Sequence, residues 1–124
     1  MKIFINDTFE AAHCLPNVEE GHKCAGIHGH SWHVRIVIEG KINEKTGWVC
    51  DFDDVKKVWK PLWEKLDHSN LNDFIPNPTS ELVATWIGEE LIKQRSGWGS
   101  NVFPDELVSV TVSETPKTGA IWEG

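Results

Sequence analysis

The chain has 124 residues, of which 25% are charged and 40% are hydrophobic, and its formal net charge is −7 at pH 7. This length predicts one domain, residues 1–124, with the composition of an ordinary soluble globular protein. The negative charge argues against nucleic acid or an anionic membrane as the main partner, and no apolar run approaches a membrane span. With no signal-peptide pattern and no disulfide framework in its three cysteines, we expect a cytoplasmic protein with reduced thiols.

The first half of the chain predicts two long strands joined by a loop. Apolar and polar residues alternate over residues 2–13 and again over residues 28–42. Residues 14–27 contain glycine, proline and several charges, and a loop of that length in a small domain is usually functional. Residues 47–52 predict a short strand after a turn.

The second half predicts two helices and two further strands. Asp53 can cap a helix that runs to about Leu66, and Pro61 is expected to kink or divide it. Residues 77–81 are typical of the start of a second helix. A surface connection and two strands follow, at residues 94–107, 107–115 and 120–123. This ββ-αα-ββ order predicts an α+β domain, a four-stranded antiparallel sheet with two helices on one face.

Three histidines and one thiol form the pattern with the clearest chemical meaning. Side chains alternate along a strand, so His28 and His30 share a face, and His13 has the matching phase on the neighbouring strand. Three imidazoles that leave a fourth position open are typical of catalytic zinc. Cys24, next to Lys23 and near the predicted cation, is a candidate thiolate. It could instead be a fourth zinc ligand that closes the site.

The other histidines and cysteines have simpler interpretations. His33 has the opposite parity on its strand, and His22 lies in the loop, so neither is expected to bind metal. Cys14 and Cys50 are expected to be buried, inert thiols.

Two acidic positions are further candidates. Asp67 and His68 form a carboxylate–imidazole pair that can relay a proton, although spacing alone slightly favours a capping aspartate and a surface histidine. Glu114 shares the parity of Val110 and Val112, and a carboxylate in that row is costly to bury without a partner. The edge of an aminopyrimidine would satisfy both of its oxygens; the alternative is an exposed strand end.

Five segments in this order resemble the 6-pyruvoyltetrahydropterin synthase superfamily over essentially the whole chain: residues 9–13, 24–30, 66–68, 77–81 and 113–115. The three-residue gap between Cys24 and His28 is similar to its 6-carboxy-5,6,7,8-tetrahydropterin synthase branch. The resemblance implies a tunnelling fold (T-fold), a homohexamer built from two trimers, and active sites between subunits. It also implies a zinc cofactor.

The resemblance also implies residue roles. Zinc would be held by His13, His28 and His30. Cys24 would abstract a proton and Asp67 with His68 would relay protons with it, which reverses the preference from spacing alone. Glu114 would anchor the pterin ring. The helix start near the pterin pocket would be Thr79, Ser80 and Glu81.

The implied reaction converts 7,8-dihydroneopterin triphosphate to 6-carboxy-5,6,7,8-tetrahydropterin, acetaldehyde and triphosphate, in queuosine biosynthesis. Three alternatives stay open. The first is a 6-pyruvoyltetrahydropterin synthase or sepiapterin-cleaving enzyme with the same site. The second is a non-catalytic zinc- or pterin-binding module, closed by Cys24. The third is a zinc hydrolase that does not need this thiol.

Overall fold

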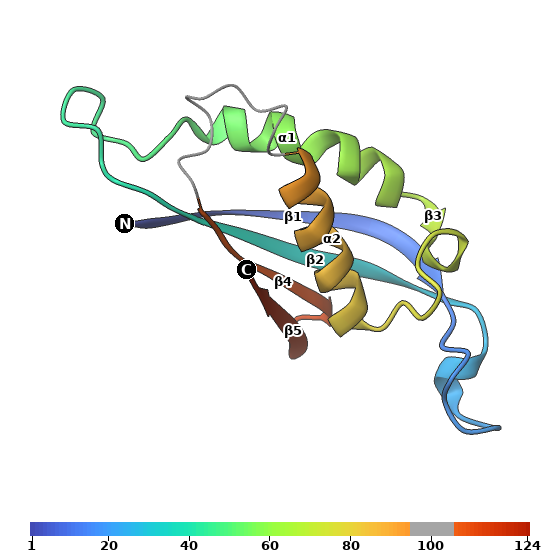
Figure 1. Ribbon diagram of the computed structural model, residues 1–124. Helices are drawn as coiled ribbons and strands as arrows, with labels where there is room; N and C mark the ends of the chain where they lie inside the picture. The colour runs from blue at the N-terminus through green and yellow to red at the C-terminus, as the bar shows by residue number, and fades with distance from the viewer. Residues whose placement is uncertain (95–105) are drawn as a thin grey trace.

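The computed structural model describes residues 1–94 and 106–124, in which two helices cover one face of a five-stranded sheet (Figure 1). The strand order is β3-β1-β2-β4-β5. The elements in chain order are β1 (Lys2–His13), β2 (His28–Glu39), α1 (Phe52–Leu66), β3 (Ser69–Asn70), α2 (Ser80–Gln94), β4 (Glu106–Thr115) and β5 (Thr118–Glu123). Two short 3₁₀ turns, η1 (Lys23–Ala25) and η2 (Leu71–Asp73), complete the list.

The α+β architecture confirms the predicted fold class, but the sheet has five strands and not four. The additional strand, β3, has only two residues and pairs in parallel with β1, where Ala11 lies opposite Ser69 and Ala12 opposite Asn70. Two residues are too few to produce an alternating pattern, so the sequence carries no signal for this strand. The other strand pairs are antiparallel.

The pairing of β1 with β2 places one row of side chains on the face that the helices cover. Phe9 lies opposite Trp32, and His13 lies opposite His28. Both Phe9 and Trp32 are fully buried, whereas His33 on the other face is exposed. The row therefore continues from the hydrophobic core directly into the histidines at the end of the sheet, as the predicted parity requires.

The region between β2 and α1 differs from the prediction. β2 ends at Glu39, and residues 47–52 form no strand but a bend followed by the start of α1. The cap of α1 is Asp51, whose side chain accepts the N–H of Asp53 at 2.9 Å, so Asp53 is not the cap. Both aspartates are residues of the capping type, and spacing alone does not choose between them.

Helix α1 is not divided at Pro61, and it contributes four buried side chains to the core. Pro61 has no N–H to donate to the carbonyl four residues earlier in the helix. Because Pro61 is exposed, water can bond to that carbonyl instead. The predicted connection at residues 94–107 lies almost entirely outside the described residues. The two predicted C-terminal strands are present as β4 and β5, with slightly wider bounds.

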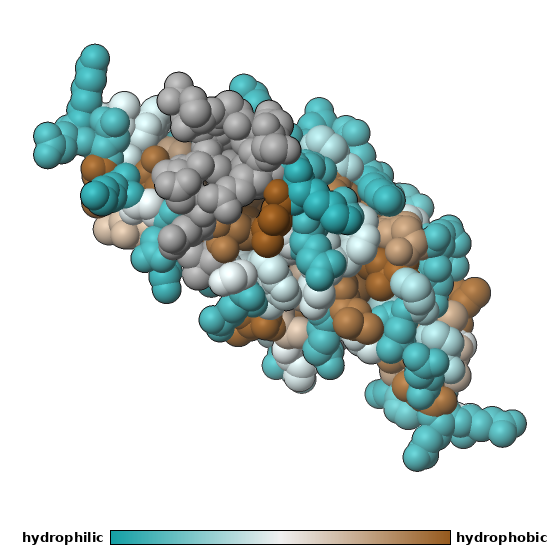
Figure 2. Space-filling model, in the orientation of Figure 1, coloured by the Kyte–Doolittle hydropathy of each residue, from teal (hydrophilic) through white to brown (hydrophobic). Residues whose placement is uncertain are grey.

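Both ends of the molecule project as hydrophilic segments beyond the layered body (Figure 2). One of them, at the lower right, is the connection between β1 and β2, which carries Cys24. Among the described residues, no helix is both long and apolar enough to cross a membrane. The three cysteines are free thiols.

Gly88 of α2 is expected to be required for packing of the C-terminal strand. A Cβ at this position would lie 2.4 Å from Cε3 of the Trp122 ring. Alanine normally stabilises a helix more than glycine does. Here, however, Gly88→Ala forces the Trp122 ring of β5 to move. We therefore expect the free energy of unfolding to fall by about 1–3 kcal/mol. Urea denaturation checks this. Glu89→Ala on the exposed side of α2 is the control, with a change within about 0.5 kcal/mol, and a stabilised Gly88→Ala protein would contradict the packing argument.

Candidate metal centre and active site

Three histidines converge where β1 ends and β2 begins. His13 is the last residue of β1 and His28 is the first residue of β2, while His30 lies one alternation further along the same face. Their ring centroids are 4.5 to 5.2 Å apart, and one nitrogen from each ring lies within 4.8 Å of the others. His13 is fully buried and packs edge-on against Trp32. The structure thus brings together the three residues predicted to bind metal.

Backbone carbonyls fix the orientation of two of these rings. Nδ1 of His13 lies 2.7 Å from the carbonyl oxygen of Pro78, and Nδ1 of His28 lies 2.8 Å from that of Gly26. Since a carbonyl only accepts, each Nδ1 carries the hydrogen and each Nε2 presents a lone pair. Such a bond on the far side of the ring is the usual support of a metal-binding histidine.

The free nitrogens of the cluster fit a metal ion. Nε2 of His13 and Nε2 of His30 are buried and have no hydrogen-bond partner. A buried polar atom without a partner costs about 1–3 kcal/mol, so this arrangement is unfavourable unless something else satisfies it. A divalent metal would do so. In the described part of the chain, the group of side chains placed to hold a metal contains these three histidines and no thiol, which favours an open site over one closed by Cys24.

Glu114 lies against this cluster. Its two carboxylate oxygens are 3.6 Å from Nε2 of His13 and 3.5 Å from Nε2 of His30, and its side chain is 29% exposed. β4 brings it there because Val112 pairs with Val34 in the middle of the sheet, and Glu114 continues the same row toward the histidines. Glu114 is therefore not a freely exposed strand end, although a small part of it remains open to a ligand.

The metal-free protein is expected to lose stability as the pH falls below about 6.5, where unfolded histidine gains a proton. Burial lowers the pKa of His13 from the ordinary 6.5; the Pro78 carbonyl and Glu114 oppose this shift, and His28 and His30 add to it. The unfolded chain takes up this proton more readily than the folded protein. The contribution of His13 to the free energy of unfolding is therefore full above about pH 6.5. It declines as the pH falls toward the lower pKa that His13 has in the folded protein, by at most about 1.4 kcal/mol per pH unit. Urea midpoints at about pH 7.5 and about pH 5.5 measure this, and equal midpoints would contradict it.

Cys24 lies in η1, in the connection between the two histidine-bearing strands, and is partly buried. Its carbonyl accepts the N–H of Leu15 at 2.9 Å and its own N–H is bonded to the ring of His22 at 3.0 Å. No hydrogen bond or ion pair within residues 1–94 and 106–124 joins Cys24 to Asp67 or His68. The described chain therefore shows no direct bond between the predicted base and the predicted proton relay.

Asp67 and His68 form a close pair on the other side of β1. Oδ2 of Asp67 lies 2.6 Å from Nδ1 of His68, and Oδ1 accepts the N–H of Glu10 at 2.9 Å. These bonds, first that from Glu10 and then that from His68, lower the pKa of the Asp67 carboxyl, so it is ionised at neutral pH. The side chain of His68 is 80% exposed. The arrangement is that of an imidazole oriented by a carboxylate and open to a partner.

The backbone of His68 is unusual. Its φ is +57°, the left-handed region that non-glycine residues rarely occupy, and its N–H donates to the carbonyl of Glu10. His68 also lines an open pocket of about 480 Å³ together with Glu10, Gly29 and His30. The pocket is thus lined by the imidazole of the pair and by one histidine of the cluster.

Thr79, Ser80 and Glu81 lie at the beginning of α2, as predicted. The hydroxyl of Thr79 accepts the N–H of Leu82 at 3.1 Å, and Ser80 is the first helical residue. Because Pro78 just before them bonds His13, the helix start is tied to the histidine cluster. Sequence reasoning missed Pro78, Gly26 and Glu10, because all three act through backbone atoms that any residue possesses.

The remaining candidates behave mostly as expected. Cys50 is buried, and burial, with smaller effects from Asp54 and Asp51, raises the pKa of its thiol, which suits an inert residue. Cys14 is only partly buried, and the side chain of Asn72 bonds both its N–H and its carbonyl.

Comparison with known proteins found a matching family and similar solved structures. The family described as 6-pyruvoyl tetrahydropterin synthase matches residues 2–124. The chain belongs to this family. Among solved structures, 6-pyruvoyl tetrahydropterin synthase of Caenorhabditis elegans is similar, with a TM-score of 0.84 and 29% identity over 100% of this chain and 95% of that one. The family thus accounts for the T-fold of the structure.

Two relatives within the family have different names. A putative 6-carboxy-5,6,7,8-tetrahydropterin synthase of Archaeoglobus fulgidus is 41% identical over 95 residues, which cover 76% of this chain and 78% of that protein. A dihydroneopterin monophosphate aldolase of Pyrococcus furiosus is 37% identical over 115 residues, which cover 86% of this chain and 96% of that protein. The family membership therefore establishes a tetrahydropterin synthase-type enzyme and leaves its reaction to be tested.

Proposed function

We propose that the protein is a zinc-dependent carbon–carbon lyase that converts 7,8-dihydroneopterin triphosphate and water to 6-carboxy-5,6,7,8-tetrahydropterin, acetaldehyde and triphosphate in queuosine biosynthesis. The observation that carries the proposal is the cluster of three histidine nitrogens, two of them buried and without a hydrogen bond, at one end of the sheet. The relatives of Archaeoglobus fulgidus and Synechocystis, each 41% identical and each named for this synthase, support it.

The metal would be held by His13, His28 and His30. Zinc in such a site acts as a Lewis acid toward the hydroxyl groups of the substrate side chain and makes the neighbouring C–H bonds more acidic. Cys24 removes a proton from the side-chain carbon as the general base. His68, oriented by the ionised Asp67, gives and takes protons at its exposed Nε2.

The pterin ring would be bound by the carboxylate of Glu114, which offers two acceptors to two parallel N–H groups, as a planar aminopyrimidine requires. The start of α2 would form the adjoining wall, through Thr79, Ser80 and Glu81.

A neighbouring subunit would complete the site. His68 is exposed and has no bond to Cys24 in its own chain, so we propose that the two meet across a subunit contact in a homohexamer, a dimer of trimers. The enzyme would work in the cytoplasm, without a nucleic-acid or membrane partner.

A second candidate function is favoured by the Pyrococcus furiosus relative, which is named an aldolase for dihydroneopterin monophosphate. The same residues suit a retro-aldol step. Removal of a proton from the second side-chain hydroxyl would break the bond between the first and second side-chain carbons. The electron pair would pass to the ring imine, and the first side-chain carbon would then take up a proton, which leaves a hydroxymethyl dihydropterin and a two-carbon aldehyde phosphate.

One experiment separates these reactions. The zinc-loaded protein is incubated separately with dihydroneopterin triphosphate and with the monophosphate, and pterins and trapped aldehydes are identified by mass spectrometry. We expect 6-carboxytetrahydropterin and acetaldehyde from the triphosphate. A hydroxymethyl pterin from the monophosphate would replace the proposal with the aldolase, and a pterin that keeps its three-carbon side chain would replace it with a pyruvoyl synthase.

A further inference from the structure

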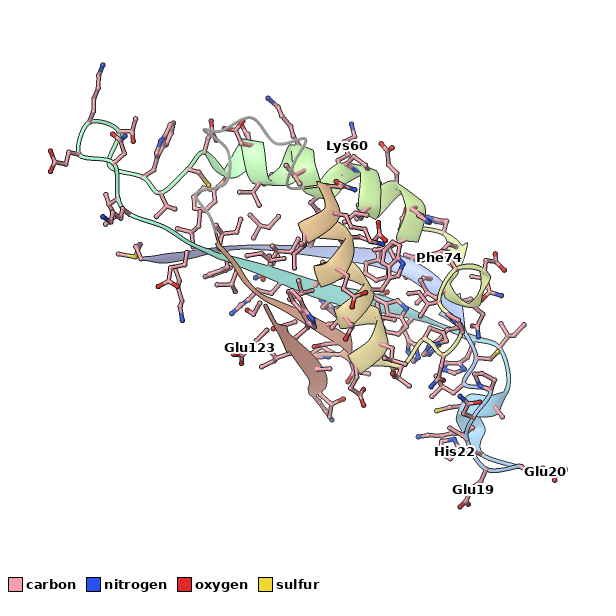
Figure 3. The ribbon with its side chains drawn as sticks, viewed as in Figure 1. Glu19, Glu20, His22, Lys60, Phe74 and Glu123 are labelled. Carbon is pink, nitrogen blue, oxygen red and sulfur yellow. The ribbon has the colours of Figure 1, made fainter. Side chains whose placement is uncertain are left out.

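The segment that carries Cys24 lies at the surface of its own chain. None of the three residues of η1 is buried. The segment projects away from the helices and the sheet, and His22 lies near its end together with Glu19 and Glu20 (Figure 3). Because no residue of η1 is buried within its own chain, the backbone direction at Cys24 depends on the hydrogen bonds of this segment.

His22 supplies two of those hydrogen bonds. Its Nδ1 accepts the N–H of Cys24 at 3.0 Å, and its carbonyl accepts the N–H of Ala25 at 3.0 Å. Its backbone is extended, with φ −66° and ψ 138°, and it occupies the cap position before η1. Aspartate, asparagine, serine and threonine usually fill this position, because each offers a side-chain acceptor two residues before the N–H.

The peptide groups on both sides of the Cys24 α-carbon are therefore held. Its N–H is fixed by the His22 ring, and its carbonyl by the N–H of Leu15 at 2.9 Å. Fixing both groups restrains rotation about the two backbone bonds of this residue and so sets the direction of the Cα–Cβ bond from which its sulfur extends. The acceptor requires a lone pair, so Nδ1 of His22 is unprotonated while this bond exists.

We propose that His22 is a positioning residue for Cys24: its unprotonated Nδ1 holds the Cys24 peptide in the orientation that proton abstraction needs. The inference rests on the proposed function of Cys24 as the general base. His22 does not touch the substrate but acts through the backbone. Its effect is expected in kcat because a displacement of about 1 Å at a reacting group costs up to about a hundredfold in rate.

Two variants test the role. In His22→Asn, Oδ1 is bonded to Cγ as Nδ1 is in histidine, so it can accept the same N–H; His22→Phe keeps a ring but has no acceptor. For His22→Phe we expect kcat to fall about tenfold or more, with KM within about threefold and the zinc content unchanged. His22→Asn is expected to keep kcat within about threefold of the original protein. A kcat of His22→Asn as low as that of His22→Phe would overturn the proposal.

A second readout does not depend on turnover. The exchange rate of the Cys24 backbone amide hydrogen with deuterium, followed by NMR, should rise at least about fivefold in His22→Phe and remain unchanged in His22→Asn. His33→Phe, at an exposed histidine on the other face of β2, is the control and should change neither measurement. Unchanged exchange in His22→Phe would overturn the positioning role. Suppose that the protein proves to be no lyase although the exchange rate of the Cys24 amide rises in His22→Phe and not in His22→Asn. In that case the proposed function is wrong, but the hydrogen bond by which His22 orients the Cys24 peptide is confirmed.

Discussion

The His28→Ala variant is expected to lose its bound zinc and about a hundredfold or more of its turnover rate. With one of three ligands removed, the remaining pair of imidazoles holds zinc too weakly to survive dialysis, and the polarisation of the substrate hydroxyls is lost with the metal. His28 suits this test because its side chain is only partly buried, so its removal disturbs the core less than removal of the fully buried His13. Metal analysis and a turnover assay on the same dialysed sample give both results.

The matched control is His33→Ala. His33 lies on the same strand, five residues further on, but its side chain is exposed on the opposite face of the sheet. It should keep its zinc and its activity. If His28→Ala retains zinc at the level of His33→Ala, the three histidines are not the metal site, and the assignment that follows from their convergence is wrong.

The Cys24→Ala variant is expected to keep its zinc and to lose turnover by a factor of about a hundred to ten thousand, the usual contribution of a positioned general base. Zinc should remain because the described group of metal-holding side chains contains no thiol. The loss should appear in kcat, with the binding of the pterin little changed.

Cys14→Ala is the control for Cys24→Ala, since Cys14 is also a partly buried thiol in the connection between β1 and β2, but is held through its backbone by Asn72. It should retain zinc and activity. Loss of zinc in Cys24→Ala would make this thiol a ligand of a closed site, whereas full activity without it would favour a zinc hydrolase.

The sequence predicted the histidine cluster because a physical regularity connects spacing with direction. Side chains alternate along a strand, and the row that contains Trp32 and Ile36 must face the core, so His28 and His30 had to point to the covered side. His33, one position out of phase, is exposed for the same reason. Alternation of this kind is preserved wherever one face of a sheet is buried.

Other parts of the candidate site could not be predicted in this way. Pro78 and Gly26 orient the histidine rings with carbonyl groups, and Glu10 holds the turn at Asp67 and His68 with its backbone. A carbonyl or N–H has no signature in the sequence, and such contacts depend on how segments far apart in the chain meet. The two-residue strand β3, which brings that turn alongside β1, is too short to produce an alternating pattern, so the sequence carries no signal for it.

The measurement that tests the central claim most directly is the amount of acetaldehyde released from dihydroneopterin triphosphate by the zinc-loaded protein and by the same protein stripped of metal. We predict one acetaldehyde for each 6-carboxytetrahydropterin formed by the loaded protein, and only background release after stripping, restored when zinc is added. A loaded protein that consumes the triphosphate without releasing acetaldehyde, or a stripped protein that releases it at the same rate, would contradict the account.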